Sequence, residues 1–179
     1  MGAGIKWALV AVLGLGTAGF LVYQDAAPKT PAPRVSPAGL PLERVTIGGK
    51  PHELEVAATV ESVQRGLSKR ATVPEGTGMI FVFPDSRILD FWMIDCLTDI
   101  DVAYLDRGGK VVSVYTMKAE APQAPGESRD AYKARLKRYP SADDAMFAVE
   151  LQAGAFAKLG VKPGDRIGLD YRQLRSHLR

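Results

Sequence analysis

Short runs of alternating apolar and polar residues follow one another from residue 42 to residue 171, which is typical of β-strands with one buried face. Residues 44–47 and 52–57 both alternate and flank the turn signal Gly48-Gly49, so we expect them to form a β-hairpin. Residues 79–83 are apolar without a break, as is typical of a strand buried on both faces. Further strands are predicted at 88–94, 100–105, 111–117, 146–151 and 166–169.

Three segments show helical features. Residues 59–70 place apolar side chains at helical spacing after Thr59, a good N-cap, although Ser62 at the third helical position predicts no capping box. Residues 130–137 follow a capping serine, and residues 153–159 end before a glycine. Together with the strands, they predict an α+β fold, mainly antiparallel β: a compact, barrel-like β domain with two to three short helices.

The first 23 residues have the composition of a signal anchor or transmembrane segment. Residues 7–23 carry no charge and would span roughly 25 Å as a helix, just under the ~30 Å hydrocarbon core of a bilayer. Lys6 on the short side predicts a single-pass protein of the inner (cytoplasmic) membrane whose remaining chain lies on the extracytoplasmic, periplasmic side. Cleavage of the segment as a signal peptide, followed by secretion, is the alternative.

The rest of the chain divides into three parts. Residues 24–41 are rich in Pro and Ala and predict a semi-extended linker. Residues 42–171 predict one globular domain, and residues 172–179 predict a basic C-terminal tail.

Composition narrows the classes of function. The 179 residues carry a net charge of +3, so bulk charge predicts no nucleic-acid partner despite a pI near 9.0. Cys96 is the single cysteine, which excludes an internal disulfide, and no Cys/His cluster is present for a structural zinc ion. We therefore expect no metal and no cofactor. The expected partners are the membrane, through the N-terminal helix, and an unidentified small ligand or protein.

Several blocks of the sequence, in this order and spacing, resemble the bacterial and archaeal domain-of-unknown-function family 192. The blocks are QRGLSKR, GMIFVFP, FWMIDCLTDIDVAYLD, GKVVSVYTM and VELQAGAFAKLGVKPGDRI, and the resemblance runs from Leu54 to Leu169. It implies a compact β-rich fold with small helices, frequent export or membrane anchoring, and no established reaction. The chain departs from the family pattern at residues 94–96, Ile-Asp-Cys instead of Lys-Asn-Thr, and at residues 99–101, Asp-Ile-Asp instead of Pro-Leu-Asp.

The segment from Gly78 to Asp106 concentrates the candidate functional residues, because it combines apolar runs, a tryptophan and a group of aspartates. We predict a binding site there, to which the helix at 59–70 contributes basic side chains. The candidate binding residues are Arg65, Arg70, Trp92, Asp95, Asp99 and Asp101. The alternative is that Phe91 and Met93 pack in the core and Trp92 lies at the rim, because neighbouring residues of a strand point to opposite faces.

Three functions remain open on these residues. A non-catalytic module that binds a ligand or partner is the first. An enzyme of unknown class, using polar groups around Asp95–Asp101, is the second. Its thiol, Cys96, adjoins a carboxylate that would raise the thiol pKa. The aspartates lack the glycine and distal glutamate of an EF-hand loop, so we assign no metal and no catalytic residue. A membrane-surface scaffold is the third, using the basic residues of 129–138 and the C-terminus.

Overall fold

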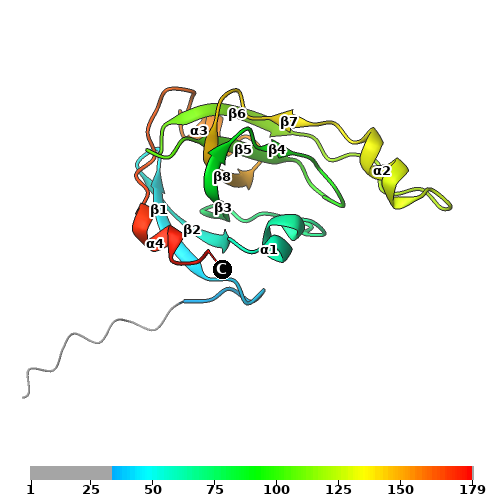
Figure 1. Cartoon of the computed structure of the whole chain (residues 1–179), viewed down its shortest axis with the longest axis horizontal. Helices are drawn as coiled ribbons and strands as arrows, with labels where there is room; N and C mark the ends of the chain where they lie inside the picture. Colours follow the sequence, from blue (N-terminus) through cyan, green and yellow to red (C-terminus); the bar gives the residue numbers. More distant parts are fainter. Residues whose placement is uncertain (1–33, 179) are drawn as a thin grey trace, which may run out of the picture. The chain divides into compact units, whose positions relative to one another are not determined.

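A computed structural model describes residues 34–178, and its centre is one six-stranded β-sheet (Figure 1). The order of the strands is β1-β2-β3-β8-β5-β6. They are β1 (Leu42–Ile47), β2 (Lys50–Ala57), β3 (Thr77–Arg87), β5 (Ile100–Leu105), β6 (Val111–Met117) and β8 (Ala145–Gln152). All neighbours in this sheet are antiparallel except β2 and β3. The prediction of a mainly antiparallel, β-rich fold with short helices is therefore confirmed.

The sheet is open, so the prediction of a barrel is wrong. β1 and β6 are its edge strands, and no ladder joins them within residues 34–178. The segment predicted as a last strand, residues 166–169, makes isolated bridges to both ends of the sheet instead. Arg166 pairs with Lys110 and Gly168 pairs with Thr46. Because each bridge involves one residue pair, this segment links the two edges without completing a ladder.

α1 (Val60–Arg65) lies in the connection between β2 and β3 and accounts for their parallel arrangement, since parallel neighbours require a crossover. The predicted N-cap is confirmed, because Thr59 Oγ1 accepts the N–H of Ser62 at 3.2 Å. The expectation that no capping box forms is wrong. Ser62 Oγ accepts the N–H of Thr59 at 3.0 Å, so a serine hydroxyl takes the role that a longer acidic side chain usually has.

Three more helices are present in the described chain, which makes one more than the upper number predicted. They are α2 (Arg129–Arg135), α3 (Ala155–Lys158) and α4 (Tyr171–Arg175). Residues 172–175, which we assigned to a basic tail, lie in α4, and Leu174 is buried in the core. Such a short helix carries too little periodicity for the sequence to show it.

The strand predicted at 88–94 is reduced to β4 (Asp90–Phe91), which pairs only with β7 (Tyr139–Pro140). Three of its apolar residues are buried outside the six-stranded sheet: Leu89 and Met93 pack in the core of one face, and Ile94 packs near α2, whereas Ile88 is exposed. An apolar run is compatible with either arrangement, because both bury its side chains.

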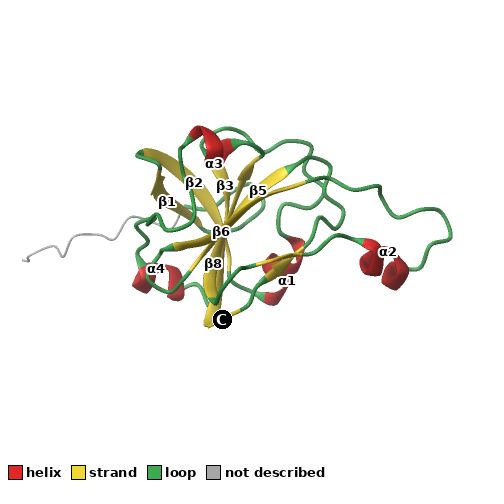
Figure 2. Ribbon diagram, turned by 90° about the horizontal axis from the view of Figure 1, so that it is seen from above, coloured by secondary structure: helices red, strands yellow, loops and turns green. Residues whose placement is uncertain are grey.

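The two faces of the sheet pack against different parts of the chain, and Figure 2 shows α1 and α2 on one side of the strands and α4 on the other. The first face is covered by α3 and α4, through Phe156 and Leu174. The second face is covered by the chain after α1 and by the segments around β4 and β7, through Leu67, Leu89, Met93 and Tyr139. The second face carries the pocket described below.

No helix within residues 34–178 combines the length and hydropathy needed to cross a bilayer. The predicted anchor at 1–23 and residues 24–33 of the predicted linker lie outside the described residues.

Candidate functional site

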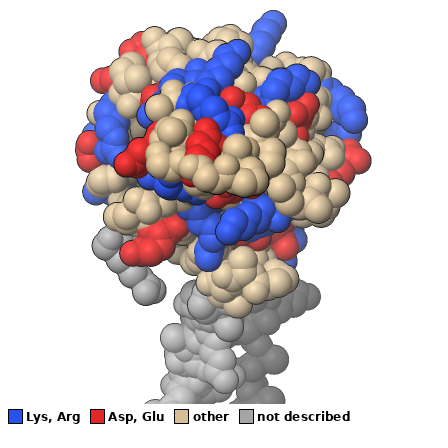
Figure 3. All heavy atoms as spheres, turned by 90° about the vertical axis from the view of Figure 1, so that its right-hand side faces the viewer, with Lys and Arg blue, Asp and Glu red and all other residues tan. Residues whose placement is uncertain are grey.

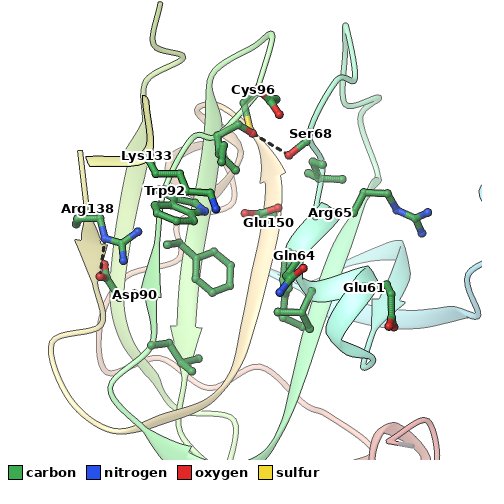
Figure 4. A pocket seen from close by; sticks show the side chains of 18 of the residues that line it. Glu61, Gln64, Arg65, Ser68, Asp90, Trp92, Cys96, Lys133, Arg138 and Glu150 are labelled. Atoms are coloured by element: carbon green, nitrogen blue, oxygen red, sulfur yellow. Dashed lines mark hydrogen bonds and ion pairs between the residues drawn. The ribbon is translucent and has the colours of Figure 1, made fainter. Parts of the chain in front are cut away.

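A pocket of about 1090 Å³ opens on the second face of the sheet (Figure 4). β3 and β8 contribute its floor, and α1, the chain after α1, residues 87–96 and α2 contribute its walls. Its volume is slightly above the ~300–1,000 Å³ that is usual for small-molecule sites. The fold therefore offers enough space for a metabolite-sized ligand.

A row of side chains across the sheet places Glu150 in the middle of the floor. The register aligns Glu55 of β2, Met79 of β3, Glu150 of β8 and Val102 of β5, so all four share one face. In the adjacent row, Phe81 meets the ring of Phe91 edge to face, with 4.8 Å between the centroids. The floor is thus apolar and aromatic around a single carboxyl group.

Glu150 is the most unusual residue of the pocket. Its side chain is buried, with the residue only 5% exposed, and its Oε2 atom has no hydrogen-bond partner in the described chain. Burial raises the pKa of this carboxyl to about 8, although the positive charge of Arg70 opposes the shift. At neutral pH the group is therefore largely protonated and can both donate and accept a hydrogen bond. An unpartnered buried polar atom costs about 1–3 kcal/mol, so a ligand that supplies the partner gains that energy.

Two segments that are distant in sequence close one wall of the pocket. Ser68 Oγ donates to the carbonyl of Ile94 at 2.8 Å, and the N–H of Lys69 donates to the carbonyl of Asp95 at 2.8 Å. Lys69 and Asp95 have left-handed φ values of 64° and 54°, respectively. Such values are uncommon outside glycine, so these backbone contacts offset local strain at the pocket wall.

Trp92 lies at the rim of the pocket. Its ring is half-buried, and the Arg138 guanidinium stands 4.1 Å from the ring centroid while it forms an ion pair with Asp90 at 2.9 Å. Met93 is buried in the core, whereas Phe91 is only partly buried against it. The arrangement agrees with the alternative in which Phe91 and Met93 face the core and Trp92 the rim, and Trp92 still lines the pocket.

Asp95 docks α2 beside the pocket. Its carboxylate accepts two hydrogen bonds from the Arg129 guanidinium, at 3.0 and 2.6 Å, and its N–H donates to Tyr132 Oη at 3.0 Å. These contacts, led by the hydrogen bonds from Arg129, hold the pKa of Asp95 below its usual value. A carboxylate that is already bound by a guanidinium is better suited to holding a wall in place than to proton transfer.

The other two aspartates of the predicted cluster lie away from the pocket. Asp99 accepts from Lys118 Nζ at 2.7 Å and from the N–H of Ala119 at 2.9 Å, contacts that lower its pKa. Asp101 is buried on the first face of the sheet, where it accepts from Thr116 Oγ1 at 2.7 Å and from the N–H of Phe156 at 3.2 Å. The described residues contain no group of three potential metal ligands.

The two predicted arginines have different positions. Arg65 lies in the last turn of α1 and lines the pocket, but its guanidinium points away from Glu150 (Figure 4). Arg70 forms two hydrogen bonds with the buried Glu55 carboxylate, at 3.0 and 2.5 Å. The structure therefore brings Arg65, Trp92 and Asp95 into one pocket. Arg70 lies behind the pocket wall, where its positive charge still lowers the pKa of Glu150.

Glu150 was missed by sequence reasoning, although one signal was available. It is the only charged residue in the otherwise apolar strand predicted at 146–151. A charge inside a buried strand requires an explanation, because a charged side chain is almost never fully buried unless it is paired. The sequence does not show which other groups meet such a residue.

Cys96 also lines the pocket, but its thiol is poorly suited to nucleophilic chemistry. Burial, and secondarily the carboxyl of Glu150, raise its pKa to about 12. The expected effect of Asp95 is present as a smaller contribution. Reactive cysteines need a lowered pKa, because the thiolate is the nucleophile.

The basic run around α2 is largely neutralised. Arg129, Arg135 and Arg138 form ion pairs with Asp95, Glu127 and Asp90. Figure 3 views this side of the domain and shows Lys and Arg side chains interspersed with Asp and Glu. Paired charges attract an anionic surface less than free ones, which weakens the case for a membrane-surface scaffold.

This open, mainly antiparallel sheet with a pocket on one face defines a small α+β domain. Over residues 43–169 the chain matches DUF192, described as "Uncharacterized ACR", and it belongs to this family. No curated protein matches it.

Solved structures similar to this chain include two bacterial proteins. A protein of unknown function from Novosphingobium aromaticivorans superposes with a TM-score of 0.61 at 26% identity, covering 77% of this chain and 93% of its own. A putative transcription regulator from Sinorhizobium meliloti gives a TM-score of 0.54 at 25% identity, covering 70% and 89%. These similarities agree with the observed fold.

Proposed function

We propose that this protein is a non-catalytic module that binds a small molecule in the pocket above β3 and β8. The observation that carries the proposal is the carboxyl group of Glu150, which lines a pocket of about 1090 Å³ and whose buried Oε2 atom has no hydrogen-bond partner within residues 34–178. Pockets that are mostly apolar, with a few polar groups in set positions, are typical of small-molecule sites.

The positions of the other polar groups favour binding over catalysis. An enzyme needs several polar groups that converge on one reacting atom. Here Asp101 lies on the opposite face of the sheet from Cys96, and Asp95 is bound by Arg129. Of the polar groups named for the enzyme alternative, Asp95 and Cys96 do line the pocket, but Asp95 is held by Arg129 and the thiol of Cys96 has a raised pKa, so neither is suited to proton transfer or nucleophilic attack.

The location we propose for the module is the extracytoplasmic side of a membrane, to which residues 1–23 anchor it. The uncharged stretch 7–23 and the Pro-rich residues that follow support this placement. We expect the full chain to remain in the membrane pellet after alkaline carbonate extraction, and its domain to be cleaved by protease added to spheroplasts. Release by carbonate would contradict anchoring, and protection from protease would contradict the orientation.

Ligand binding can be followed through Trp92, because Trp7 is the other of the two tryptophans. In the Trp7→Phe full chain, we expect the emission of Trp92 to change saturably when the right compound enters the pocket. The titration uses a library of organic acids, sugars, amines and aromatic compounds. Ca²⁺, Mg²⁺ and anionic lipid vesicles form separate arms.

A control variant is needed to interpret this titration. Trp92→Phe removes the signal, so binding to that variant is measured by calorimetry to confirm that the ligand still enters. If no compound changes the emission and none produces a heat of binding, the module does not bind small molecules. A response only to vesicles would support the membrane-surface alternative instead.

A further inference from the structure

Charges around the pocket are unbalanced, and the imbalance indicates the chemistry of the ligand. Lys69 and Lys133 both line the pocket, and neither is paired with a carboxylate within residues 34–178. The arginines on the α2 side of the pocket are neutralised by aspartates, as described above. Glu61, a rim carboxylate that also lacks an ion pair in this part of the chain, points away from Glu150 (Figure 4). The free charge that faces the cavity is therefore positive.

The two lysines are placed so that they can meet a ligand. Lys133 is half-buried on α2 and lies beside Trp92, with its ammonium group directed toward the interior of the pocket (Figure 4). Lys69 is exposed at the wall, where its backbone is held by the hydrogen bond to the Asp95 carbonyl. A lysine that is partly removed from water and has no carboxylate partner favours an incoming anion, because hydrogen bonds to charged groups are strong.

The floor of the pocket indicates a second property of the ligand, a polar group that can bond to Glu150. The buried Oε2 atom of Glu150 has no hydrogen-bond partner in the part of the chain that the structure describes, and the end of α1 that approaches it is a glycine. A Cβ atom added to Gly66 would lie 3.9 Å from this oxygen. Gly66 has a φ of +49°, which L-residues rarely adopt, so the chain offers no polar side chain from this position. A polar group of a ligand can supply the missing partner, and a hydroxyl suits a carboxyl group in either protonation state.

We propose that the pocket binds a small organic anion that also carries hydroxyl groups, such as a sugar acid or a sugar phosphate. Lys69 and Lys133 hold the carboxylate or phosphate near the rim, and a hydroxyl group bonds to the free oxygen of Glu150. The carbon skeleton lies against Phe81 and Phe91, which supply the apolar floor. This inference rests on the proposed function, because it names the class of ligand for the same pocket.

Five compounds test separately whether the ligand needs an anionic group and whether it needs hydroxyl groups. D-glucuronate and D-glucose 6-phosphate carry both an anion and hydroxyl groups, and they also distinguish a carboxylate from a phosphate. Methyl glucoside has the hydroxyl groups without the anion, cyclohexanecarboxylate has the anion without the hydroxyl groups, and glucosamine carries a cation. In calorimetry on the detergent-solubilised full chain at pH 7, we expect at least one hydroxylated anion to bind about tenfold more tightly than the other three compounds.

Matched variants test the assignment of residues. Lys133→Gln is expected to weaken the hydroxylated anion about tenfold and to leave methyl glucoside unchanged. Lys162→Gln, an exposed lysine in the turn after α3, makes the same change of charge away from the pocket and should have no effect. Glu150→Leu, which removes both oxygens and keeps an apolar side chain of similar size, should weaken the hydroxylated anion and leave cyclohexanecarboxylate unaffected. Circular dichroism of each variant confirms that it is folded.

The outcomes distinguish this inference from the proposed function. If methyl glucoside, cyclohexanecarboxylate or glucosamine binds as tightly as the hydroxylated anions, the ligand class is wrong and the pocket still binds small molecules. The ligand class is also wrong if none of the five probes binds while the Trp92 titration finds another ligand. Equal weakening by Lys133→Gln and Lys162→Gln would show that the anion is not held in this pocket. If none of the five probes binds and the Trp92 titration also finds no ligand, both the inference and the proposed function are wrong.

Discussion

Replacing Glu150 by Gln is expected to remove most of a loss of stability that the unmodified protein shows between about pH 5 and pH 8. The carboxyl has an ordinary pKa of 4.5 and a pKa of about 8 when buried in the fold. Between these values the folded state binds more protons than the unfolded state, so the free energy of unfolding falls as pH rises. At ~1.4 kcal/mol for each pKa unit, the loss from this one group has an upper limit of about 5 kcal/mol.

The charged and titratable groups around Glu150 are Arg70, Cys96 and Tyr104. The pKa of Tyr104, like that of Cys96, is raised by burial and then by Glu150, so neither ionises below pH 8. Arg70 keeps its charge throughout, as arginine does in proteins. The change between pH 5 and pH 8 at this position therefore comes from Glu150 itself.

Urea unfolding at several pH values, followed by Trp92 fluorescence with Trp7→Phe in both proteins, measures the effect. As pH rises from 5 to 8, we expect the unfolding free energy of the unmodified protein to fall more than that of Glu150→Gln. The variant should therefore become the more stable of the two relative to their difference at pH 5. Glu75→Gln, at an exposed position, is the matched control and should leave the pH dependence unchanged. If the unfolding free energies of Glu150→Gln and the unmodified protein change equally with pH, Glu150 ionises with an ordinary pKa.

Asp101→Ala is expected to destabilise the domain by about 3 kcal/mol without changing ligand affinity. The buried carboxylate accepts hydrogen bonds from Thr116 Oγ1 and from the N–H of Phe156 in α3. Its removal leaves two donors without their acceptor and weakens the attachment of α3 to β5. The pocket lies on the other face of the sheet, so its geometry should be preserved.

Asp99→Ala is the control for this prediction. Its carboxylate is partly exposed, and solvent screens its ion pair with Lys118, so we expect a loss below about 1 kcal/mol. Urea unfolding compares the two variants, and calorimetry with a pocket ligand shows whether binding is preserved. Equal losses of stability, or a loss of binding in Asp101→Ala alone, would contradict the structural role assigned to Asp101.

Strand positions were the most predictable part of this fold. The hairpin β1–β2, the runs of β3 and β8, and the alternating β5 and β6 all lie where hydrophobic patterning placed them. Patterning succeeds there because each strand buries at least one face against its neighbours. It failed at residues 88–94, where apolar side chains are buried outside a ladder.

The candidate site was predictable only as a region. Residues 65–69 and 94–96, together with Trp92, do line one pocket, whereas Arg70 lies behind its wall. The aspartates, however, were treated as one cluster because they are close in sequence. The strand period sends Asp101 to the opposite face, and Asp99 pairs with Lys118 instead.

Local patterns of burial and hydrogen bonding were thus sufficient to predict the strands of the six-stranded sheet and the N-cap of α1, and the order of the sequence blocks was sufficient to predict the family. The open sheet, the parallel pairing of β2 with β3 and the position of Glu150 at the pocket are instead properties of the folded domain. These features depend on which strands become neighbours. The neighbours align Glu150 between Met79 and Val102 and bring α1 and α2 to the same pocket. No local pattern contains that information, since it arises from residues far apart in the chain.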